Sequence, residues 1–210
     1  MTDEKKKRSP DPSIRPRFPK LRAKKSFGQN FLVDSSVIEN IVAAISPSDG
    51  ETIIEIGPGR GALTERLIES ASRVVAIEFD RDLLPPLRRQ FGDARNFELI
   101  EDDALQVDLC SAIAPAKTAR LVANLPYYIS TAILQRLLEQ RGCLTELVLM
   151  LQREVAARIT AAPSTSERGY LSVLVEAQSE VEKLFDVRQQ RFIQCPKCGA
   201  LWFASRFGQR

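Results

Sequence analysis

Hydrophobic and polar positions along the chain follow two alternating patterns. Short β-branched or continuous apolar runs predict buried strands, and longer stretches with apolar residues three or four positions apart predict helices. The predicted strands span 52–57, 73–79, 96–101, 119–124, 145–151 and 180–187. The predicted helices span 61–71, 81–91, 131–141, 153–162 and 169–178. Strands that alternate with helices in this way predict an α/β fold with a doubly wound sheet.

One more amphipathic helix is predicted before the first strand. Its apolar face is formed by Val37, Ile38, Ile41, Val42 and Ile45. A serine hydroxyl can accept from the unpaired backbone N–H groups at a helix start, so we expect Ser35 or Ser36 to be the N-cap. Pro85 and Pro86 fall early in the predicted helix 81–91 and should distort its first turn.

The stretch from Thr52 to Thr64 organises the predicted sheet. Its β-branched run ends in Gly57-Pro58-Gly59-Arg60-Gly61, and a helix follows at once. Glycine lets the backbone approach a ligand closely, and a helix N-terminus offers unpaired N–H groups. Glu78, at the end of the next strand, stands where an acid commonly binds ribose hydroxyls. Three interpretations stay open: an NAD-type oxidoreductase, an S-adenosylmethionine (AdoMet) methyltransferase, and a turn that binds nothing.

Composition narrows the chemistry. The 210 residues are 44% hydrophobic and 27% charged, which fits one globular domain with a short appendage. The chain has no histidine, which excludes Ser-His-Asp and Cys-His catalysis and removes the commonest metal ligand. No apolar run is long enough to span a bilayer, and the four cysteines are too irregularly spaced for a disulfide framework. We therefore expect a cytoplasmic protein without a membrane segment or a metal.

The net charge of +3 is unevenly distributed along the chain. Lysines, arginines and prolines crowd residues 1–23, and such a composition cannot bury enough apolar surface to fold alone. This basic arm would either contact the phosphates of a nucleic acid without reading sequence or act only as a solubilising tail.

Two further loops follow predicted strands and carry polar residues. Asp102 and Asp103 come after the third strand, where an acid could accept from the amine of a bound adenine or simply cap a helix. Asn124-Leu125-Pro126-Tyr127 comes after the fourth strand. This second loop is either a proline-fixed strand end or a site for methylating an exocyclic nitrogen.

The methylation hypothesis gives each residue of that loop a role. An adenine N6 is a poor nucleophile because its lone pair is delocalised into the ring. The Asn124 side-chain oxygen and the Leu125 carbonyl could accept from the N6 hydrogens and draw the lone pair out of conjugation. Pro126 would fix the turn, and Tyr127 could stack on the base. An oxidoreductase has no evident proton donor in this sequence, so the methyltransferase interpretation is favoured.

Taken together, the motifs resemble the small-subunit rRNA adenine N6,N6-dimethyltransferase family. They are Phe27-Gly28-Gln29-Asn30-Phe31-Leu32, Glu55-Ile56-Gly57-Pro58-Gly59-Arg60-Gly61-Ala62-Leu63-Thr64, Ile77-Glu78-Phe79-Asp80, Asp103-Ala104 and Asn124-Leu125-Pro126-Tyr127. The resemblance implies a class I AdoMet-dependent methyltransferase domain with a Rossmann-like doubly wound sheet, followed by a small helical domain. It also implies dimethylation of two adjacent adenosines in the 3′-terminal hairpin loop of 16S rRNA during small-subunit biogenesis, by a monomer acting on the immature subunit.

The resemblance also implies roles for single residues. Asn30 and Leu32 would close over AdoMet, and Gly57 would contact its amino-acid portion. Glu78 would hold the ribose hydroxyls, and Asp103 would hold the adenine amine. Asn124 would touch both the cofactor and the target adenine, and Leu125, Pro126 and Tyr127 would grip that base.

The family pattern stops after Val187. We therefore expect a methyltransferase domain over 24–187 and an aberrant tail over 188–210 that replaces the antiparallel seventh strand and the helical domain. A shift of one nucleotide in the reading frame would restore a family-like segment, which suggests a frameshift. A competing hypothesis takes Cys195 and Cys198 as half of a zinc site.

The apolar Leu201, Trp202 and Phe203 would then either cover the open edge of the sheet or expose a surface prone to aggregation. Two functions stay open for the whole chain. One is an active rRNA adenine dimethyltransferase, and the other is a non-catalytic RNA-binding relic of that enzyme.

Overall fold

The computed structural model describes residues 31–32, 34–125, 129–187, 192–193 and 200–208. Its helices are α1 (Ser35–Ile45), α2 (Ala62–Ser70), α3 (Leu84–Phe91), α4 (Leu109–Ala112), α5 (Ser130–Glu139), α6 (Arg153–Ile159) and α7 (Tyr170–Glu176). Its strands are β1 (Phe31–Leu32), β2 (Thr52–Ile56), β3 (Arg73–Glu78), β4 (Phe97–Glu101), β5 (Ala119–Asn124), β6 (Leu144–Gln152), β7 (Glu180–Val187), β8 (Phe192–Ile193) and β9 (Ala200–Arg206). The predicted alternation of strands and helices from β2 to β7 is confirmed.

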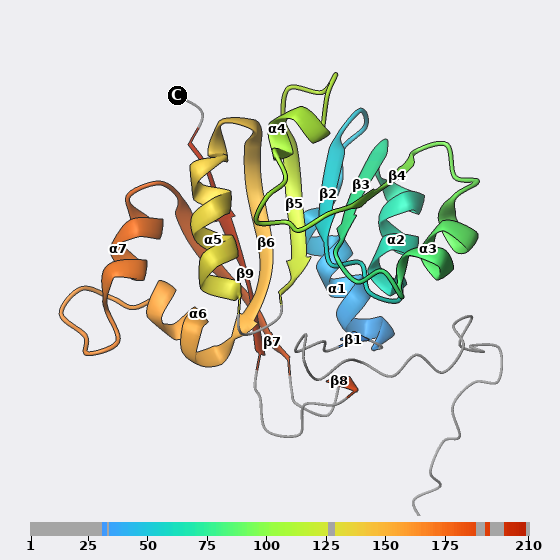
Figure 1. The fold of residues 1–210 in the computed structure, drawn as a ribbon. Helices are drawn as coiled ribbons and strands as arrows, with labels where there is room; N and C mark the ends of the chain where they lie inside the picture. The colour runs from blue at the N-terminus through green and yellow to red at the C-terminus, as the bar shows by residue number, and fades with distance from the viewer. Residues whose placement is uncertain (1–30, 33, 126–128, 188–191, 194–199, 209–210) are drawn as a thin grey trace, which may run out of the picture.

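A seven-stranded sheet with the order β4-β3-β2-β5-β6-β9-β7 forms the centre of the molecule (Figure 1). Strands β2 to β6 are mutually parallel, and β9 runs antiparallel to both of its neighbours. From β2 the chain first winds outward to β3 and β4, and it then returns to β5 on the other side. A doubly wound sheet opens a crevice at the carboxyl ends of the strands where this reversal occurs.

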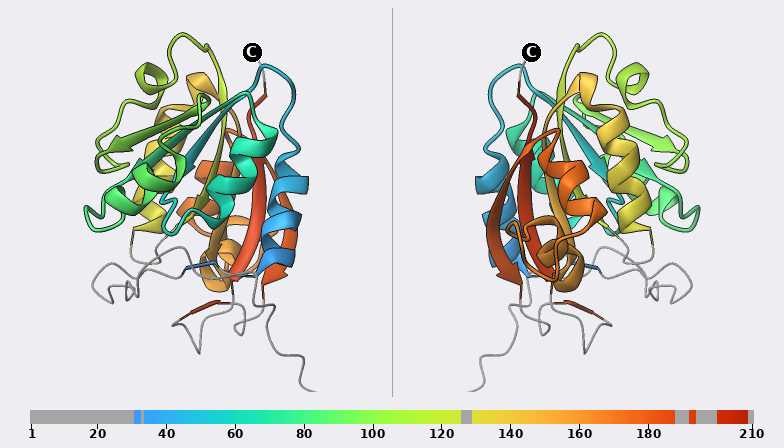
Figure 2. Two further views of the ribbon diagram at one scale, coloured as in Figure 1. Left: turned by 90° about the vertical axis from the view of Figure 1, so that its right-hand side faces the viewer. Right: turned by 90° about the vertical axis from the view of Figure 1, so that its left-hand side faces the viewer.

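Helices cover both faces of the sheet (Figure 2). On one face α1 and α2 pack against apolar strand residues such as Ile53, Val74 and Val122. On the opposite face α5 and α6 pack against residues such as Ile54, Leu121 and Leu149. Because helices cover both faces and neighbouring residues of a strand point to opposite faces, both sets of side chains are buried and the central strands are mostly apolar.

The prediction that the seventh strand is missing is wrong. Ala200–Arg206 forms β9, which pairs along its whole length with β6 on one side and β7 on the other. Strand β9 occupies an interior position of the sheet, so the apolar tail residues neither cover an edge nor face solvent. The sheet therefore extends beyond residue 187, where the family pattern was expected to end.

Strand β9 fits this position because its alternate side chains serve both cores. Ala200 and Trp202 join the core under α1 and α2, and Leu201 and Phe203 join the core under α5 and α6. All four side chains are buried, and the Trp202 ring stacks on Phe185 of β7 with the ring centres 6.4 Å apart. The five-residue apolar run Ala200–Ala204 is buried on both faces, so it behaves as an interior strand whatever its similarity to the family segment.

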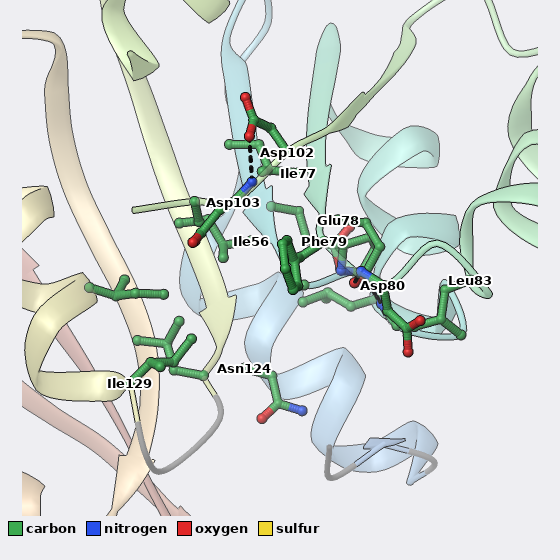
Figure 3. Close-up of a pocket in the computed structure, with 18 of the residues that line it drawn as sticks. Ile56, Ile77, Glu78, Phe79, Asp80, Leu83, Asp102, Asp103, Asn124 and Ile129 are labelled. Carbon is green, nitrogen blue, oxygen red and sulfur yellow. Dashed lines mark hydrogen bonds between the residues drawn. The ribbon is translucent and has the colours of Figure 1, made fainter. Parts of the chain in front are cut away.

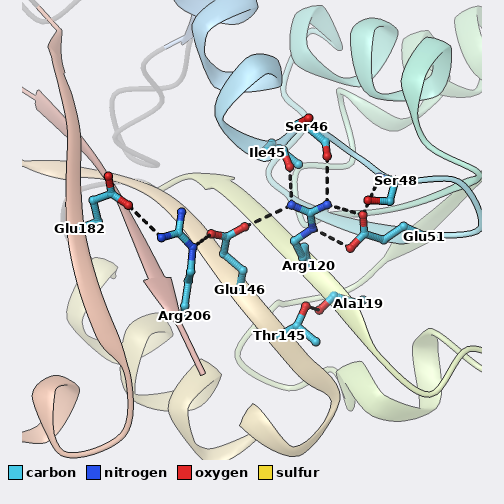
Figure 4. A network of polar contacts seen from close by, with 10 residues as sticks. All are labelled: Ile45, Ser46, Ser48, Glu51, Ala119, Arg120, Thr145, Glu146, Glu182 and Arg206. Atoms are coloured by element: carbon cyan, nitrogen blue, oxygen red, sulfur yellow. Dashed lines mark hydrogen bonds and ion pairs between the residues drawn. The ribbon is translucent and has the colours of Figure 1, made fainter. Parts of the chain in front are cut away.

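A chain of charged side chains ties β9 to its neighbours at the amino ends of the parallel strands (Figure 4). Arg206 of β9 donates from Nε to Glu146 of β6 at 2.7 Å and from Nη1 to Glu182 of β7 at 2.9 Å. Glu146 also accepts from Arg120 Nη1 at 3.3 Å, and Arg120 Nε donates to Glu51 at 2.7 Å. The network links four strands to the segment that enters β2, opposite the carboxyl-end crevice.

The N-terminal ends of helices α1 and α3 differ from the sequence prediction. Asp34, not a serine, is the N-cap of α1, because its carboxylate accepts from the N–H groups of Ser36 and Val37. Helix α3 begins at Leu84, so Pro85 and Pro86 lie in its first turn, where a missing N–H costs nothing.

Cys110 of α4 and Cys143 form a disulfide with their Cα atoms 5.5 Å apart. The prediction that the cysteines form no disulfide framework did not anticipate this bond, because the fold brings together residues that are 33 positions apart. These two cysteines therefore do not support the expected reducing compartment. Cys195 and Cys198 lie outside the described residues. Within the described part of the chain, no helix is both long enough and apolar enough to cross a membrane.

We expect Phe203→Ala to lower the free energy of unfolding by about 3–5 kcal/mol, because it leaves a cavity at a fully buried position of β9. Urea unfolding can be followed through the fluorescence of Trp202, the single tryptophan of the chain, which is itself buried in β9. Phe207→Ala is the matched control, since Phe207 follows β9 and is only partly buried. Equal losses in the two variants would contradict the interior position of β9.

Candidate functional site

A cavity of about 260 Å³ lies at the carboxyl ends of β2, β3, β4 and β5, in the crevice expected from the order of the strands. Figure 3 shows side chains from these strand ends surrounding one common space. Residues from the entering strand β1, the glycine turn and the start of α5 complete the lining, through Leu32, Arg60 and Ile133 respectively. Residues of the glycine turn and of the two polar loops predicted from the sequence therefore line the same cavity.

The turn between β2 and α2 depends on glycine backbone geometry. Gly57, Gly59 and Gly61 have φ angles of 72°, 58° and 76°, a region that side chains disfavour by roughly 1–2 kcal/mol per residue. A Cβ on Gly61 would lie 2.4 Å from the Phe91 ring, so this glycine also permits α2 and α3 to pack closely. A Cβ on Gly57 would meet nothing within 4 Å, which places open space beside this part of the cavity wall.

Glu55 lies beneath this turn, in the last part of β2. Its side chain is 2% exposed and lines the cavity, and its carboxylate accepts from the Thr64 hydroxyl at 2.7 Å. This hydrogen bond joins the end of β2 to the first turn of α2 across the glycines. Burial raises the pKa of Glu55 to about 7 against the opposing effect of the Thr64 hydrogen bond, and the nearby negative charge of Glu78 adds to the rise.

Glu78 ends β3 and is also buried, with 6% of its surface exposed. Its carboxylate accepts from the backbone N–H groups of Asp80 at 2.8 Å and Gly59 at 3.2 Å. Burial raises its pKa above the ordinary value, although these two N–H groups oppose the rise. The bond to Gly59 fixes the glycine turn of one strand against the end of the next.

The neighbouring residue Phe79 is 60% exposed and lines the cavity. In Figure 3 its ring points into the space between Asp103 and Glu78. Asp103 accepts from the backbone N–H of Leu105 at 2.9 Å, so one carboxylate oxygen fixes its own loop. Asp103 therefore closes a turn of its own loop at the cavity and caps no helix, because the next helix, α4, begins at Leu109 with Asp108 as its N-cap.

Asn124 ends β5 and lines the cavity from the side opposite β3 (Figure 3). Leu125 follows it, is only 1% exposed, belongs to the core under α5 and α6 and also lines the cavity. Leu32 of β1 is buried and also lines the cavity. Strand β1 pairs with β8, so the tail also reaches this end of the sheet. Asn30, Pro126 and Tyr127 lie outside the described residues.

The model of a protein family described as ribosomal RNA adenine dimethylase matches residues 20–199 of the chain. The chain belongs to this family. The matched range extends from the end of the basic arm into the tail beyond β7, and it contains every candidate residue of the cavity.

Relatives and solved structures support membership of the adenine dimethylase family. The chain is 44% identical over 176 residues to the ribosomal RNA small subunit methyltransferase A of Hahella chejuensis, covering 84% of this chain and 64% of that protein. It is 43% identical over 201 residues to the protein of the same name from Chromohalobacter salexigens, covering 94% and 71%. The chain thus spans about two thirds of the length of these relatives.

Two solved structures share the fold at 26% identity and a TM-score of 0.76. One is a dimethyladenosine transferase from Plasmodium falciparum, of which the alignment covers 63%, together with 85% of this chain. The other is the 23S rRNA methyltransferase ErmE, with 71% of that chain and 86% of this one covered. The methyltransferase fold expected from the sequence is confirmed.

Sequence analysis gave no role to several residues that line this dimethylase-family cavity. They are Glu55, Arg60, Phe79 and Asp80, which lie within the family motifs but had no predicted role. Glu55 resembles an ordinary strand residue, although a carboxyl group inside an otherwise apolar run is a signal of a buried acid. Phe79 directly follows the acid that ends β3, and this position after a strand end was its only signal.

Gly57→Ala should cost about 1–2 kcal/mol of stability from backbone strain alone, because open space receives the new methyl group. Gly61→Ala should cost about 3 kcal/mol or more, since overlap with Phe91 adds to a similar strain. Urea unfolding of both variants provides the measurement. A Gly61→Ala protein as stable as Gly57→Ala would show that α3 does not pack against the turn as described.

The raised pKa of Glu55 predicts a pH-dependent stability. The folded chain holds a proton on Glu55 up to about pH 7, whereas the unfolded chain loses it near the ordinary value of 4.5. Stability should therefore fall as pH rises between these values, by up to about 3 kcal/mol. Glu55→Gln cannot ionise, so this part of the slope should disappear in unfolding curves recorded across that range. If the free energy of unfolding of Glu55→Gln depended on pH as that of the unmodified chain does, groups other than Glu55 would have to bind the proton on folding.

Proposed function

We propose that this chain transfers methyl groups from AdoMet to the N6 atoms of two adjacent adenosines in the 3′-terminal hairpin loop of 16S rRNA. The observation that carries the proposal is the convergence of Glu78, Asp103 and Asn124, from three different strand ends, on one cavity beside a glycine turn. Membership of the adenine dimethylase family and the names of the relatives support the reaction class and the rRNA substrate.

The cavity suits AdoMet in its shape and its charge. The open space beside Gly57 leaves room for a ligand to approach the backbone closely. Five carboxyl groups and one guanidinium line the cavity, so it attracts a positively charged ligand. AdoMet supplies an activated methyl group on a positively charged sulfur. In this proposal Gly57 contacts its amino-acid portion, Glu78 holds the ribose, Asp103 holds the adenine amine and Leu32 covers it with Asn30.

The chain's own part in the reaction is to hold the target nitrogen. The Asn124 side-chain oxygen and the Leu125 carbonyl accept from the N6 hydrogens, which favours a lone pair directed out of the ring plane. Pro126 and Tyr127 keep the roles expected from the sequence, fixing the loop and stacking on the base. The departing proton passes to water, so no histidine or other general base is required.

The target base must leave its stack to reach a cavity at a strand end, and an adenosine in a hairpin loop does so at lower cost than one in a duplex. The basic arm over 1–23 would hold the phosphates around that loop. We further propose that the protein acts as a monomer in the cytoplasm, on the immature small subunit.

The test is methyl transfer from labelled AdoMet to small subunits that lack the two dimethyladenosines. We expect label on the two loop adenosines, and we expect Asn124→Ala to reduce the rate at least about a hundredfold because it removes one of the two acceptors. Asp93→Ala, which changes an exposed residue outside the cavity, is the control and should keep full activity. AdoMet binding without transfer by the unmodified chain would favour the non-catalytic RNA-binding alternative.

A further inference from the structure

Glu55 has no role in the proposed binding of AdoMet or of the target base, although it lines the same cavity. It is the more deeply buried of the two acids at the ends of β2 and β3, and Thr64 is its hydrogen-bond donor. Among the described residues, neither Glu55 nor Glu78 takes part in a salt bridge. A buried carboxylate without a cationic partner is costly, so the arrangement favours a ligand that brings positive charge.

The groups that face Glu55 come from each element around the cavity. Glu78 and Asp80 lie at the end of β3, Asp102 and Asp103 follow β4, and Arg60 lies in the glycine turn. Thr64 of α2 and Asn124 of β5 are uncharged. The charged lining groups at the ends of β3 and β4 are thus all acids, and Arg60 is the one cation of the described lining.

The two buried acids are not equivalent. Glu78 receives two backbone N–H groups, from Gly59 and Asp80, which stabilise its negative charge within the protein itself. Glu55 receives a single hydroxyl, from Thr64. Its charge is therefore less compensated than that of Glu78, and a bound cation would change its ionisation more.

We propose that Glu55 is a specificity-determining residue that makes the cavity distinguish the cationic methyl donor from the demethylated product. This inference rests on the proposed use of AdoMet. Donor and product, S-adenosylhomocysteine, share the adenosine and the amino-acid portion, and they differ in one methyl group and one positive charge on sulfur. An ionised carboxylate at the base of the cavity attracts that charge, whereas a neutral carboxyl does not.

The discrimination is expected to depend on pH with a definite sign. Burial raises the pKa of Glu55 to about 7, so the free protein carries a neutral carboxyl below this pH and a carboxylate above it. A donor cation favours the carboxylate and releases the proton when it binds at lower pH, which costs affinity. Affinity for the donor relative to the product should therefore rise with pH and level off above about pH 7.

The experiment is calorimetric titration of the full chain with AdoMet and with S-adenosylhomocysteine at about pH 6 and about pH 8. We expect the ratio of the two dissociation constants to shift at least about threefold toward AdoMet at the higher pH. Titration of the ligands' own amino groups falls in this range, but it affects every variant of the protein alike. In Glu55→Gln, the ratio of the two dissociation constants should therefore change with pH only as far as the ligands' own amino groups titrate.

Two further variants distinguish a charge effect from a structural one. Asp93→Asn makes the same acid-to-amide change at an exposed acid outside the cavity and should keep the pH dependence of the unmodified chain. Thr64→Val removes the hydrogen bond that lowers the pKa of Glu55, so it should move the rise in discrimination to higher pH. This shift is a readout that mere loosening of the turn would not produce.

The outcomes separate this inference from the proposed function. Binding of neither ligand to the folded chain would overturn the proposed function. Binding of both ligands with the same pH dependence in the unmodified chain and in Glu55→Gln would leave that function in place and overturn the role of Glu55. An unmoved midpoint in a folded Thr64→Val variant would also count against it.

Discussion

The backbone turn from β2 into α2 is the constraint on which the site depends. Three glycines with positive φ reverse the chain within five residues, and side chains at these positions would strain or obstruct the turn. Two buried acids hold the turn from below: Glu55 through Thr64 on α2, and Glu78 through the backbone of Gly59. The strand ends that carry Glu78, Asp103 and Asn124 belong to strands that pair with β2 directly or through β3.

Strand β9 supports that arrangement from a distance. Strands β5 and β6 separate it from β2, and its side chains complete both cores that hold α1 and α5 against the sheet. Arg206 adds a polar link through Glu146 to Arg120 at the amino ends of the strands. A partly exposed ion pair contributes little by itself, so packing of the apolar face of β9 has the larger share in holding the tail in place.

The sequence predicted the site better than it predicted the tail, and the reason is physical. Glu78 and Asn124 end strands and Asp103 follows one, and parallel strands bring their carboxyl ends to one edge, so local patterns were sufficient to predict that the three residues line one cavity. The position of β9 depends on pairing with both β6 and β7, and these two strands lie on either side of it only in the folded chain. Residues 200–206 do not resemble the family segment, so they were not predicted to form a strand. The alternation of Trp202 and Phe203 between the two faces was the signal that indicated one.

The charge of the cavity limits how an RNA can use it. Five carboxyl groups around one space repel phosphate as strongly as they attract a cation, so only an uncharged base is expected to enter. The RNA phosphates on either side of that base have to stay outside the cavity, where cations other than those of the lining would bind them. Lysine and arginine are concentrated in residues 1–23, and in the proposed function this basic arm would supply those cations. In the proposed function, cofactor and nucleic acid would then be selected by opposite charges in two different parts of the chain.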